Sequence, residues 1–281
     1  MLRVAVPNKG SLAEPASAML REAGYSQRSD ARELVLQDPE NRTEFFFLRP
    51  RDIAVYVGSG RLDIGITGRD LLLDSGAPAE ELLELGFAPS TFRYAALPGS
   101  ATAVRDLEGL RVASAYPGLV GKHLADLGVS AEIIRLDGAV ETAVRLGVAD
   151  VIADVVSTGT TLRQAGLELV GEPILHSEAV LVRRIGAPPS ASLEQLVRRL
   201  KGVIIARRYV MLDYDIRAEQ VEAASRITPG IESPTVAPLH EPGWVAVRAM
   251  ILRRDRHRVM DELWEMGARG ILVTDIAACR L

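Results

Sequence analysis

The 281-residue chain is long enough for a large hydrophobic core and for two or three domains. Its formal net charge of −4 gives no reason to expect nucleic acid as a partner, and no apolar run approaches the length of a membrane-spanning helix. The single cysteine, Cys279, excludes an intrachain disulfide and fits a reducing cytoplasm, and the four histidines show no zinc-ligand spacing.

Short β-rich apolar runs alternate with helical patterns through about two thirds of the chain. Strands are predicted at LRVAVP (2–7), EFFFLR (44–49), LDIGIT (62–67), FRYAAL (92–97), LRVASA (110–115), AEIIRL (131–136), DVIADVV (150–156) and EAVLVRR (178–184), with helices at 12–23, 51–57, 119–127 and 140–146. This alternation favours parallel sheets with helices on both faces.

Two crossing segments divide this part of the chain into two lobes. GFAPSTFRYAALPG (86–99) is typical of a segment that crosses from the first lobe to the second. After GEPILHSEAVLVRR (171–184) the chain returns to the first lobe. We therefore expect one lobe of residues 1–90 with 177–208, a second lobe of 91–176, and a ligand cleft between them.

From about Tyr209 the pattern changes to strand, helix, strand, strand, helix, strand. This is the order of a ferredoxin-like unit. Residues 209–281 are thus predicted to form a small separate α+β domain.

The strand predicted at 150–156 carries two carboxylates in an apolar run. Alternation puts Asp150 and Asp154 on one side of the strand, but roughly 13 Å of extended chain separates them. Ligands of open α/β sheets bind at the carboxyl ends of strands, where Asp154 lies. We predict that Asp154 accepts hydrogen bonds from a sugar and that Asp150 is a satisfied residue at the strand's start.

The loop after this strand is the run Ser157, Thr158, Gly159, Thr160 and Thr161. Gly159 allows close backbone approach, so that consecutive N–H groups and hydroxyls can surround an anion at the start of a helix. A loop of this kind taken alone more often only caps a helix. Because Asp154 and Glu141 are expected at the same sheet edge, the loop instead predicts a site for a ribose 5-phosphate.

These residues belong to a longer pattern, Glu141, Gly147-Val148-Ala149-Asp150, Asp154 and Gly159-Thr160-Thr161-Leu162. The pattern resembles the signature of the ATP phosphoribosyltransferases, which catalyse the first step of histidine biosynthesis. Segments similar to the long form of that family also occur at 3–12, 44–72, 135–144, 228–239 and 271–281, so the resemblance covers essentially the whole chain.

The resemblance implies a Mg²⁺-dependent transfer of the phosphoribosyl group from phosphoribosyl pyrophosphate (PRPP) to N1 of the ATP adenine, with feedback inhibition by histidine. It implies lobes of the periplasmic-binding-protein type and a C-terminal ferredoxin-like (ACT-like) domain that binds histidine. It also implies dimers that assemble into hexamers in the cytoplasm, without nucleic acid or membrane partners. The ligands of the metal are unknown.

Cations and a base-binding surface are expected around the cleft. Lys9 and Arg49 follow strands and are predicted to supply positive charge to phosphates, although each taken alone is as often a solvated side chain. Gly68 precedes a helix in which Asp70 either contacts the nucleotide or only caps the helix. Tyr116 either lies against the adenine or packs on the protein surface.

The C-terminal domain offers acceptors for an ammonium group and donors for a carboxylate. Asp213 and Asp215 lie in one predicted strand, and Ser233 and Thr235 lie in an irregular stretch. The resemblance selects Asp215, Ser233 and Thr235 for the histidine site; without it they are at least as often loop caps.

Two other functions fit parts of the sequence. A two-lobed small-ligand-binding protein without catalysis would show the same strands and helices, and residues 56–68 alone fit one equally well. A phosphoribosyltransferase acting on another base would share the phosphate loop. The loop with its paired acids favours an enzyme, and only the whole-chain resemblance selects ATP.

Overall fold

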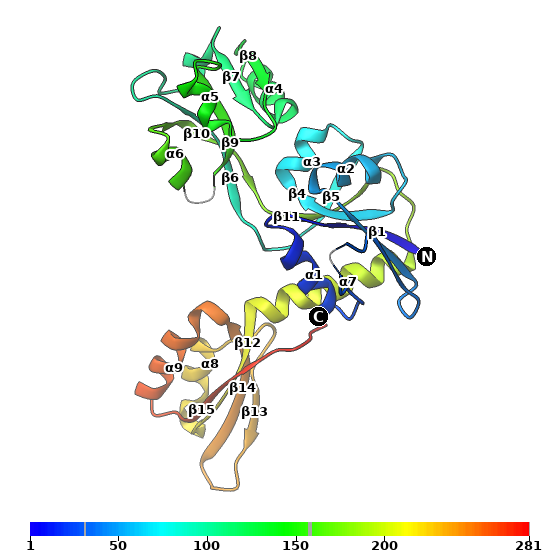
Figure 1. Ribbon diagram of the computed structural model, residues 1–281. Helices are drawn as coiled ribbons and strands as arrows, with labels where there is room; N and C mark the ends of the chain where they lie inside the picture. The colour runs from blue at the N-terminus through cyan, green and yellow to red at the C-terminus, as the bar shows by residue number, and fades with distance from the viewer. Residues whose placement is uncertain (31, 157–158, 281) are drawn as a thin grey trace. The chain divides into compact units, whose positions relative to one another are not determined.

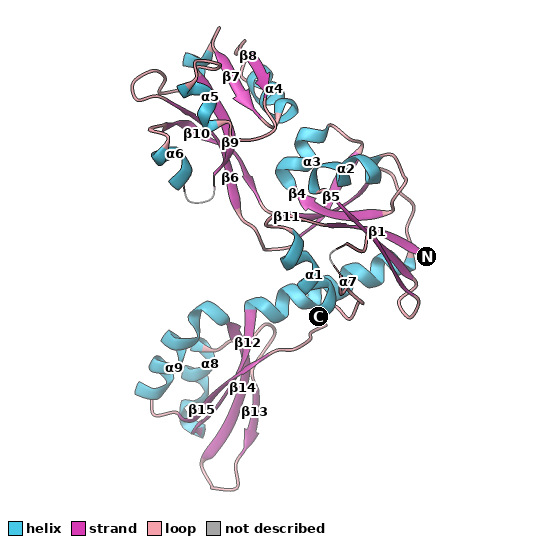
Figure 2. Cartoon of the chain, in the orientation of Figure 1, coloured by secondary structure: helices cyan, strands magenta, loops and turns pink. Residues whose placement is uncertain are grey.

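The computed structural model describes residues 1–30, 32–156 and 159–280 of the chain (Figure 1). They form two compact units, Met1–Leu20 with Tyr25–Leu193 and Arg21–Gly24 with Glu194–Leu281. Helices and strands occur in both units (Figure 2). Each unit is described by itself below.

The first sheet of the larger unit has the strand order β2-β3-β1-β4-β11-β5. Its strands are β1 (Leu2–Pro7), β2 (Val35–Asp38), β3 (Thr43–Leu48), β4 (Ile64–Gly68), β5 (Ala79–Glu84) and β11 (Ala179–Arg184), and its helices are α1 (Ala13–Glu22), α2 (Pro50–Gly58) and α3 (Arg69–Ser75). β1 runs parallel to β3 and β4, so the loops after these strands gather at one edge. Gly65 lets α2 pack closely on β4, because a Cβ at this position would lie 2.4 Å from Ile53 Cγ2.

The second sheet of this unit has the order β10-β6-β9-β7-β8. Its elements are β6 (Ser90–Ala96), β7 (Arg111–Ser114), α4 (Pro117–Asp126), β8 (Glu132–Arg135), α5 (Glu141–Arg145), β9 (Val151–Val156), α6 (Thr160–Gln164) and β10 (Glu168–Ser177), with a 3₁₀ turn at η1 (Val104–Leu107). β7 is parallel to β8 and β9, whereas β6 is antiparallel to both of its neighbours.

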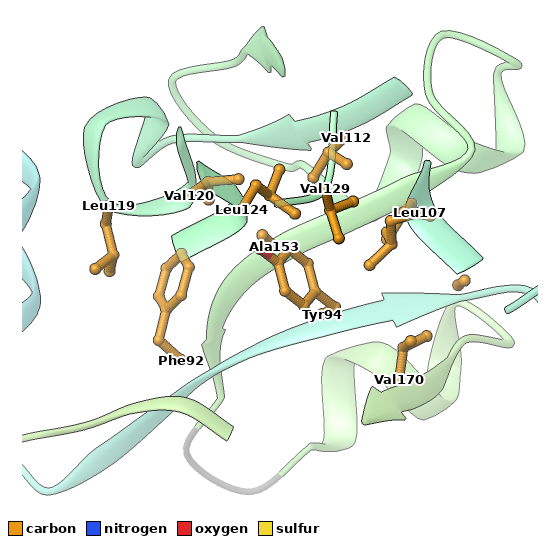
Figure 3. Packing of buried hydrophobic residues seen from close by; sticks show 12 residues of the cluster. Phe92, Tyr94, Leu107, Val112, Leu119, Val120, Leu124, Val129, Ala153 and Val170 are labelled. Carbon is orange, nitrogen blue, oxygen red and sulfur yellow. The ribbon is translucent and has the colours of Figure 1, made fainter. Parts of the chain in front are cut away.

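Alternation along the strands gives the second sheet two different faces. Phe92 and Tyr94 point into a large core with Leu124 of α4, which Figure 3 shows. Ala95 and Ile152 point to the opposite face, where a smaller core forms against α5 and α6. Asp154 is two residues beyond Ile152 and therefore faces the α5 and α6 side.

Two neighbouring segments connect the sheets. Ala179 N donates to the Phe87 carbonyl oxygen at 3.0 Å, and Gly86 N donates to Glu178 Oε2 at 2.8 Å. The chain thus passes from one sheet to the other and returns beside its own outward path. The predicted two-lobed α/β fold of the periplasmic-binding-protein type is confirmed.

The smaller unit contains α7 (Ala191–Arg208) from Glu194 onward and a sheet of order β13-β14-β12-β15. Its other elements are β12 (Tyr209–Arg217), η2 (Ala218–Gln220), α8 (Val221–Ile227), β13 (Thr235–Pro238), β14 (Trp244–Leu252), η3 (Arg253–Asp255), α9 (Arg256–Glu265) and β15 (Arg269–Asp275). Numbered in chain order, the strands read 2-3-1-4 across an antiparallel sheet. The predicted ferredoxin-like domain is confirmed.

One face of this sheet is covered by helices and carries the core of the unit. Val210, Leu212, Tyr214 and Ile216 alternate along β12 and pack in one cluster with residues of α8 and α9. Both tryptophans of the chain also belong to this unit: the Arg217 guanidinium lies 4.5 Å from the Trp244 ring centroid, and Arg269 lies 4.4 Å from that of Trp264.

The compact units differ from the predicted domains in the place of α7, which the sequence assigned to the first lobe. The C-terminal segment packs on this helix so closely that a Cβ at Gly202 would lie 2.1 Å from the Cys279 carbonyl oxygen. Arg253 Nε also donates to the Arg207 carbonyl oxygen at 3.1 Å. The lobe boundaries at 90/91 and 176/177 stay predictions.

Candidate active site

A cavity of about 260 Å³ opens in the larger unit beside the loops that follow β1 and β4. Residues of both sheets and of the connecting segments form its walls, among them Lys9, Pro50, Gly68, Asp70, Tyr116, Val155, Ser177 and Glu178. Four of these, Lys9, Gly68, Asp70 and Tyr116, are residues that the sequence predicted for the cleft. The structure therefore brings together side chains that are more than a hundred positions apart.

The predicted phosphate loop leads from β9 into α6. Ser157 and Thr158 lie outside the described residues. Gly159 adopts the left-handed conformation (φ 69°) immediately before α6, which begins at Thr160. A side chain with a Cβ is disfavoured at that φ, so the glycine allows the abrupt change from strand to helix.

Asp154 lies half-buried near the end of β9, next to the cavity-lining Val155. Asp154 Oδ1 accepts a hydrogen bond from Val155 N at 2.8 Å. Burial raises the pKa of the Asp154 carboxyl, and the negative charges of Glu141 and Asp70 raise it further. The charges of three predicted site residues therefore interact: Asp154, Asp70 and Glu141, the last at the start of α5.

Asp150 has a different role at the other end of the same strand. Its carboxylate accepts two hydrogen bonds from the Arg111 guanidinium, at 2.8 and 3.0 Å, and one from Arg111 N at 3.0 Å. These bonds lower the pKa of Asp150. The prediction that Asp150 is a satisfied residue at the strand's start is confirmed.

Asp70 is held at the start of α3 by a residue from the return crossing. Asp70 N donates to Ser177 Oγ at 3.1 Å, and the Ser177 hydroxyl donates to Asp70 Oδ1 at 2.8 Å. Both side chains are buried, at 7% and 5% exposure. Gly68 leaves room for this carboxylate, since a Cβ there would lie 2.3 Å from Asp70 Oδ1. The Asp70 carboxylate therefore accepts from Ser177 rather than serving as the cap of its own helix, whose N-cap residue Gly68 has no side chain to offer.

Tyr116 precedes α4 and contacts three kinds of group. Its ring meets Phe92 edge to face at 5.0 Å, and the Arg51 guanidinium lies 4.8 Å from its centroid. Burial raises the pKa of the Tyr116 phenol, and the charge of Asp70 and a hydrogen bond to its side chain act in the same direction. Tyr116 thus lines the cavity and also packs within the protein, and its place against the adenine stays a prediction.

A small polar network fixes the start of α4 beside Tyr116. Asp74 Oδ2 accepts from Arg51 Nη1 at 3.0 Å, while Asp74 Oδ1 accepts from Gly118 N at 2.9 Å and Leu119 N at 3.2 Å. The side chain of an α3 residue therefore caps α4, a helix of the other sheet.

The predicted cations occupy different places. Lys9 is exposed in the loop after β1 and lines the cavity. Arg49 is exposed immediately before α2 and is not among the described residues of the cavity wall. The positive charge at the cavity wall therefore comes from Lys9.

The residues expected to bind histidine lie on the smaller unit. Asp215 is half-buried in β12, whereas Ser233 and Thr235 are exposed. The register places Thr235 opposite Arg248 of β14, which is itself opposite Asp213 and bonded to it at 2.6 Å. Thr235 is thus level with Asp213 rather than with Asp215.

Sequence reasoning missed Ser177, which lines the cavity, and Arg51, which packs on the ring of the cavity-lining Tyr116. Ser177 is the last residue of β10 and lies 107 positions from Asp70, and no local pattern joins the two. Arg51 belongs to a segment expected only to form a helix. Only the cleft between the predicted lobes indicated that distant residues would meet.

The comparisons with known proteins agree along the whole chain. The model of the ATP phosphoribosyltransferase family (HisG) matches residues 49–202, and that of the HisG C-terminal domain matches 206–278. Proteins named ATP phosphoribosyltransferase from Salinispora tropica and Streptomyces avermitilis are 66% and 63% identical, and the matches cover 100% of this chain and of each relative. The chain belongs to the ATP phosphoribosyltransferase family.

A solved structure supports the same assignment. The ATP phosphoribosyl transferase (HisG:HisZ) complex from Thermotoga maritima superposes with a TM-score of 0.61 at 25% identity, covering 72% of this chain and 99% of that one. The HisG C-terminal domain, matched at residues 206–278, gives the chain the long form. The protein is a phosphoribosyltransferase of histidine biosynthesis, and the alternative of a binding protein without catalysis is set aside.

No helix in the described ranges combines the length and the apolar character needed to cross a membrane.

Proposed function

We propose that the chain transfers the phosphoribosyl group of PRPP to N1 of the ATP adenine and releases pyrophosphate. The observation that carries the proposal is the cavity at the carboxyl ends of β1 and β4, where Lys9, Asp70 and Tyr116 meet beside the end of β9. A cation, an acceptor and an aromatic ring at one cavity match the phosphates, the amino group and the face of a nucleotide.

The donor would lie on the β9 side of the cavity. Backbone N–H groups and hydroxyls of residues 157–161 hold the 5-phosphate, and Asp154 and Glu141 accept hydrogen bonds from the ribose hydroxyls. Breaking the bond from C1 to pyrophosphate leaves an oxocarbenium-like centre, which the neighbouring carboxylates stabilise. Lys9 on the cavity wall provides positive charge for the leaving group, and Arg49, outside the described wall, stays the predicted second cation.

Mg²⁺ fits this arrangement through the substrate. Within the described ranges no three His, Cys, Asp or Glu side chains are grouped closely enough to hold a metal ion. Mg²⁺ commonly binds through one or two carboxylates, water and substrate phosphates, and Asp154 and Glu141 are the neighbouring carboxylates available for it. When bound, it would neutralise charge on the pyrophosphate.

The test is to mix the purified chain with ATP, PRPP and Mg²⁺ and to follow the ultraviolet absorbance of the N1-substituted product together with pyrophosphate release. Omitting PRPP should abolish both signals, and replacing ATP by GTP should do the same. A folded protein that produces neither signal with the complete mixture would refute the proposal.

The C-terminal unit is proposed to bind histidine through Asp215, Ser233 and Thr235 and thereby to inhibit the transfer. Inhibition from another domain requires different histidine affinities in the active and inactive states. In isothermal titration calorimetry, Asp215→Ala should weaken histidine binding at least about tenfold, as expected when a charged partner of the ammonium group is lost. Unchanged affinity would move the site elsewhere. We also propose a cytoplasmic homo-oligomer that assembles from dimers to a hexamer, which light scattering with and without histidine would check.

A further inference from the structure

Asp70 is a buried carboxylate on the wall of the cavity. Among the described residues no Lys, Arg or His forms an ion pair with it, and Arg51 pairs with Asp74 instead. The hydrogen-bond partner described for its side chain is neutral, the Ser177 hydroxyl, and the Tyr116 phenol interacts with it on the same cavity wall. A buried carboxylate in such surroundings favours a ligand that brings N–H donors or positive charge.

The proposed reaction supplies both N–H donors and positive charge on the adenine of the substrate. The lone pair of adenine N1 forms the new bond to C1 of the ribose, and the electron pair of the C1–O bond leaves with pyrophosphate. No proton has to move. The adenine gains positive charge that spreads from N1 to the neighbouring 6-amino group, whose N–H bonds become stronger donors.

We propose that Asp70 accepts a hydrogen bond from the 6-amino group of the adenine and stabilises the positive charge that develops on the base, with Ser177 as the residue that positions it. This inference rests on the proposed function and adds the group that selects adenine. A carboxylate acceptor favours a 6-amino group and repels the 6-oxo group of guanine or hypoxanthine. The interaction strengthens in the transition state, so its loss lowers kcat more than it raises KM for ATP.

The return crossing explains how Ser177 keeps Asp70 in place. Glu178 accepts from Arg69 N through its carbonyl oxygen at 3.0 Å, and Arg69 Nη1 donates to the His176 carbonyl oxygen at 3.2 Å. With the two bonds between Ser177 and Asp70, the crossing is attached to the first turn of α3 at consecutive residues. The Ser177 hydroxyl binds one carboxylate oxygen and thereby fixes the direction of the other.

The experiment compares ATP with the triphosphate of purine riboside, which keeps N1 and lacks only the 6-amino group. Pyrophosphate release is measured for both substrates with wild type, Asp70→Asn, Ser177→Ala and Ser177→Thr. Any intrinsic difference between the two bases is the same for every variant, so the ratio of their kcat/KM values isolates the contact with the amino group.

Asp70→Asn should lower kcat/KM for ATP by about 10²-fold, mainly through kcat, and that for the analogue by less than about threefold. Ser177→Ala should shift the ratio in the same direction by about tenfold, and Ser177→Thr, which keeps the hydroxyl, should restore it. Equal losses on both substrates, or an unchanged ratio in folded Asp70→Asn, would overturn the proposal. A wild-type protein that releases no pyrophosphate with ATP would instead refute the proposed function itself.

Discussion

Replacing Asp154 by Asn is expected to make the larger unit more stable and the enzyme less active. The carboxylate loses water on folding and faces the charges of Glu141 and Asp70, which is why its pKa is raised. Among the described residues, the hydrogen bond from Val155 N offsets this penalty, and an Asn oxygen can accept the same bond. The variant therefore removes the charge and keeps the contact.

The magnitudes follow from the two roles of the charge. Removing an unfavourable buried charge should raise the free energy of unfolding by roughly 0.5–2 kcal/mol, the gain that a single stabilising substitution commonly gives. For a unit of this size about 1 kcal/mol shifts Tm by about 2–4 °C. Losing the carboxylate beside an oxocarbenium-like centre should lower kcat by about 10²–10³-fold.

The pH dependence gives the sign of the effect independently. Because the folded state holds the Asp154 proton more tightly, wild-type stability falls as pH rises from the ordinary value of 3.8 through the raised pKa. The Asn variant lacks this loss. The difference in stability between variant and wild type should therefore be small below pH 3.8 and reach its full value above the raised pKa.

Asp150→Asn in the same strand is the matched control with the opposite sign. Its pKa is lowered by Arg111, so this carboxylate contributes stability above the ordinary value of 3.8 and loses it as pH falls through the lowered pKa. The variant should melt at a lower temperature than wild type near neutral pH. The effect should be modest, because the Asp150 side chain is 38% exposed and solvent screens the ion pair.

Calorimetric melting of both variants between pH 3 and 8, with turnover measured in parallel, checks these expectations. A lower Tm for Asp154→Asn near neutral pH would refute the reasoning about burial. Turnover within threefold of wild type would end the role of Asp154 at the ribose.

Two further variants test the packing of each unit. Gly118→Ala should lower the free energy of unfolding of the larger unit by about 1–3 kcal/mol in urea denaturation, because the new Cβ would lie 2.3 Å from the Asp74 carbonyl oxygen. In Gly121→Ala, the control in the same helix, the nearest atom is a side-chain methyl at 3.3 Å, so an equal loss there would argue against a specific clash at Gly118. Tyr214→Phe should destabilise the smaller unit by about 1 kcal/mol, because it removes the buried hydroxyl that bonds Thr228 Oγ1 at 2.8 Å; unchanged thermal unfolding of that unit would contradict the bond.

The central strands were predictable because burial determines their residues. β1 and β4 are apolar on both faces, and the predicted runs at 2–7 and 62–67 overlap them closely. Strands whose residues are not determined by burial were missed. β5 reads AEELLE and looks helical, but ion pairs of its carboxylates stabilise it at the sheet edge, Glu80 with Arg183 at 2.8 Å and Glu81 with Arg69 at 2.9 Å.

β10 was missed for a different reason. It contains Gly171 and Pro173, which ordinarily break strands. The strand accommodates them through an irregularity in its pairing with β6 between Val170 and Leu175, with Gly171 at φ 62°. Such an interruption depends on the partner strand and is invisible in a single segment.

The residues of the candidate site likewise include some that were predictable and some that were not. Asp154 and Glu141 were predictable because each follows from its place in one strand or one helical turn. The pairing of Ser177 with Asp70 was not, because it joins a crossing segment to a helix of another part of the chain. Local pattern thus indicates which residues lie at a sheet edge, and only the fold decides which of them touch.

The location of the two tryptophans has a practical optical consequence. Trp244 and Trp264 both belong to the C-terminal unit, so the larger unit is silent in tryptophan emission, whereas circular dichroism reports the backbone of both units. Recording the two signals in one chemical denaturation would reveal, without any added label, whether the units melt together or in sequence. Adding histidine to the same sample would then show which of the two transitions the amino acid displaces.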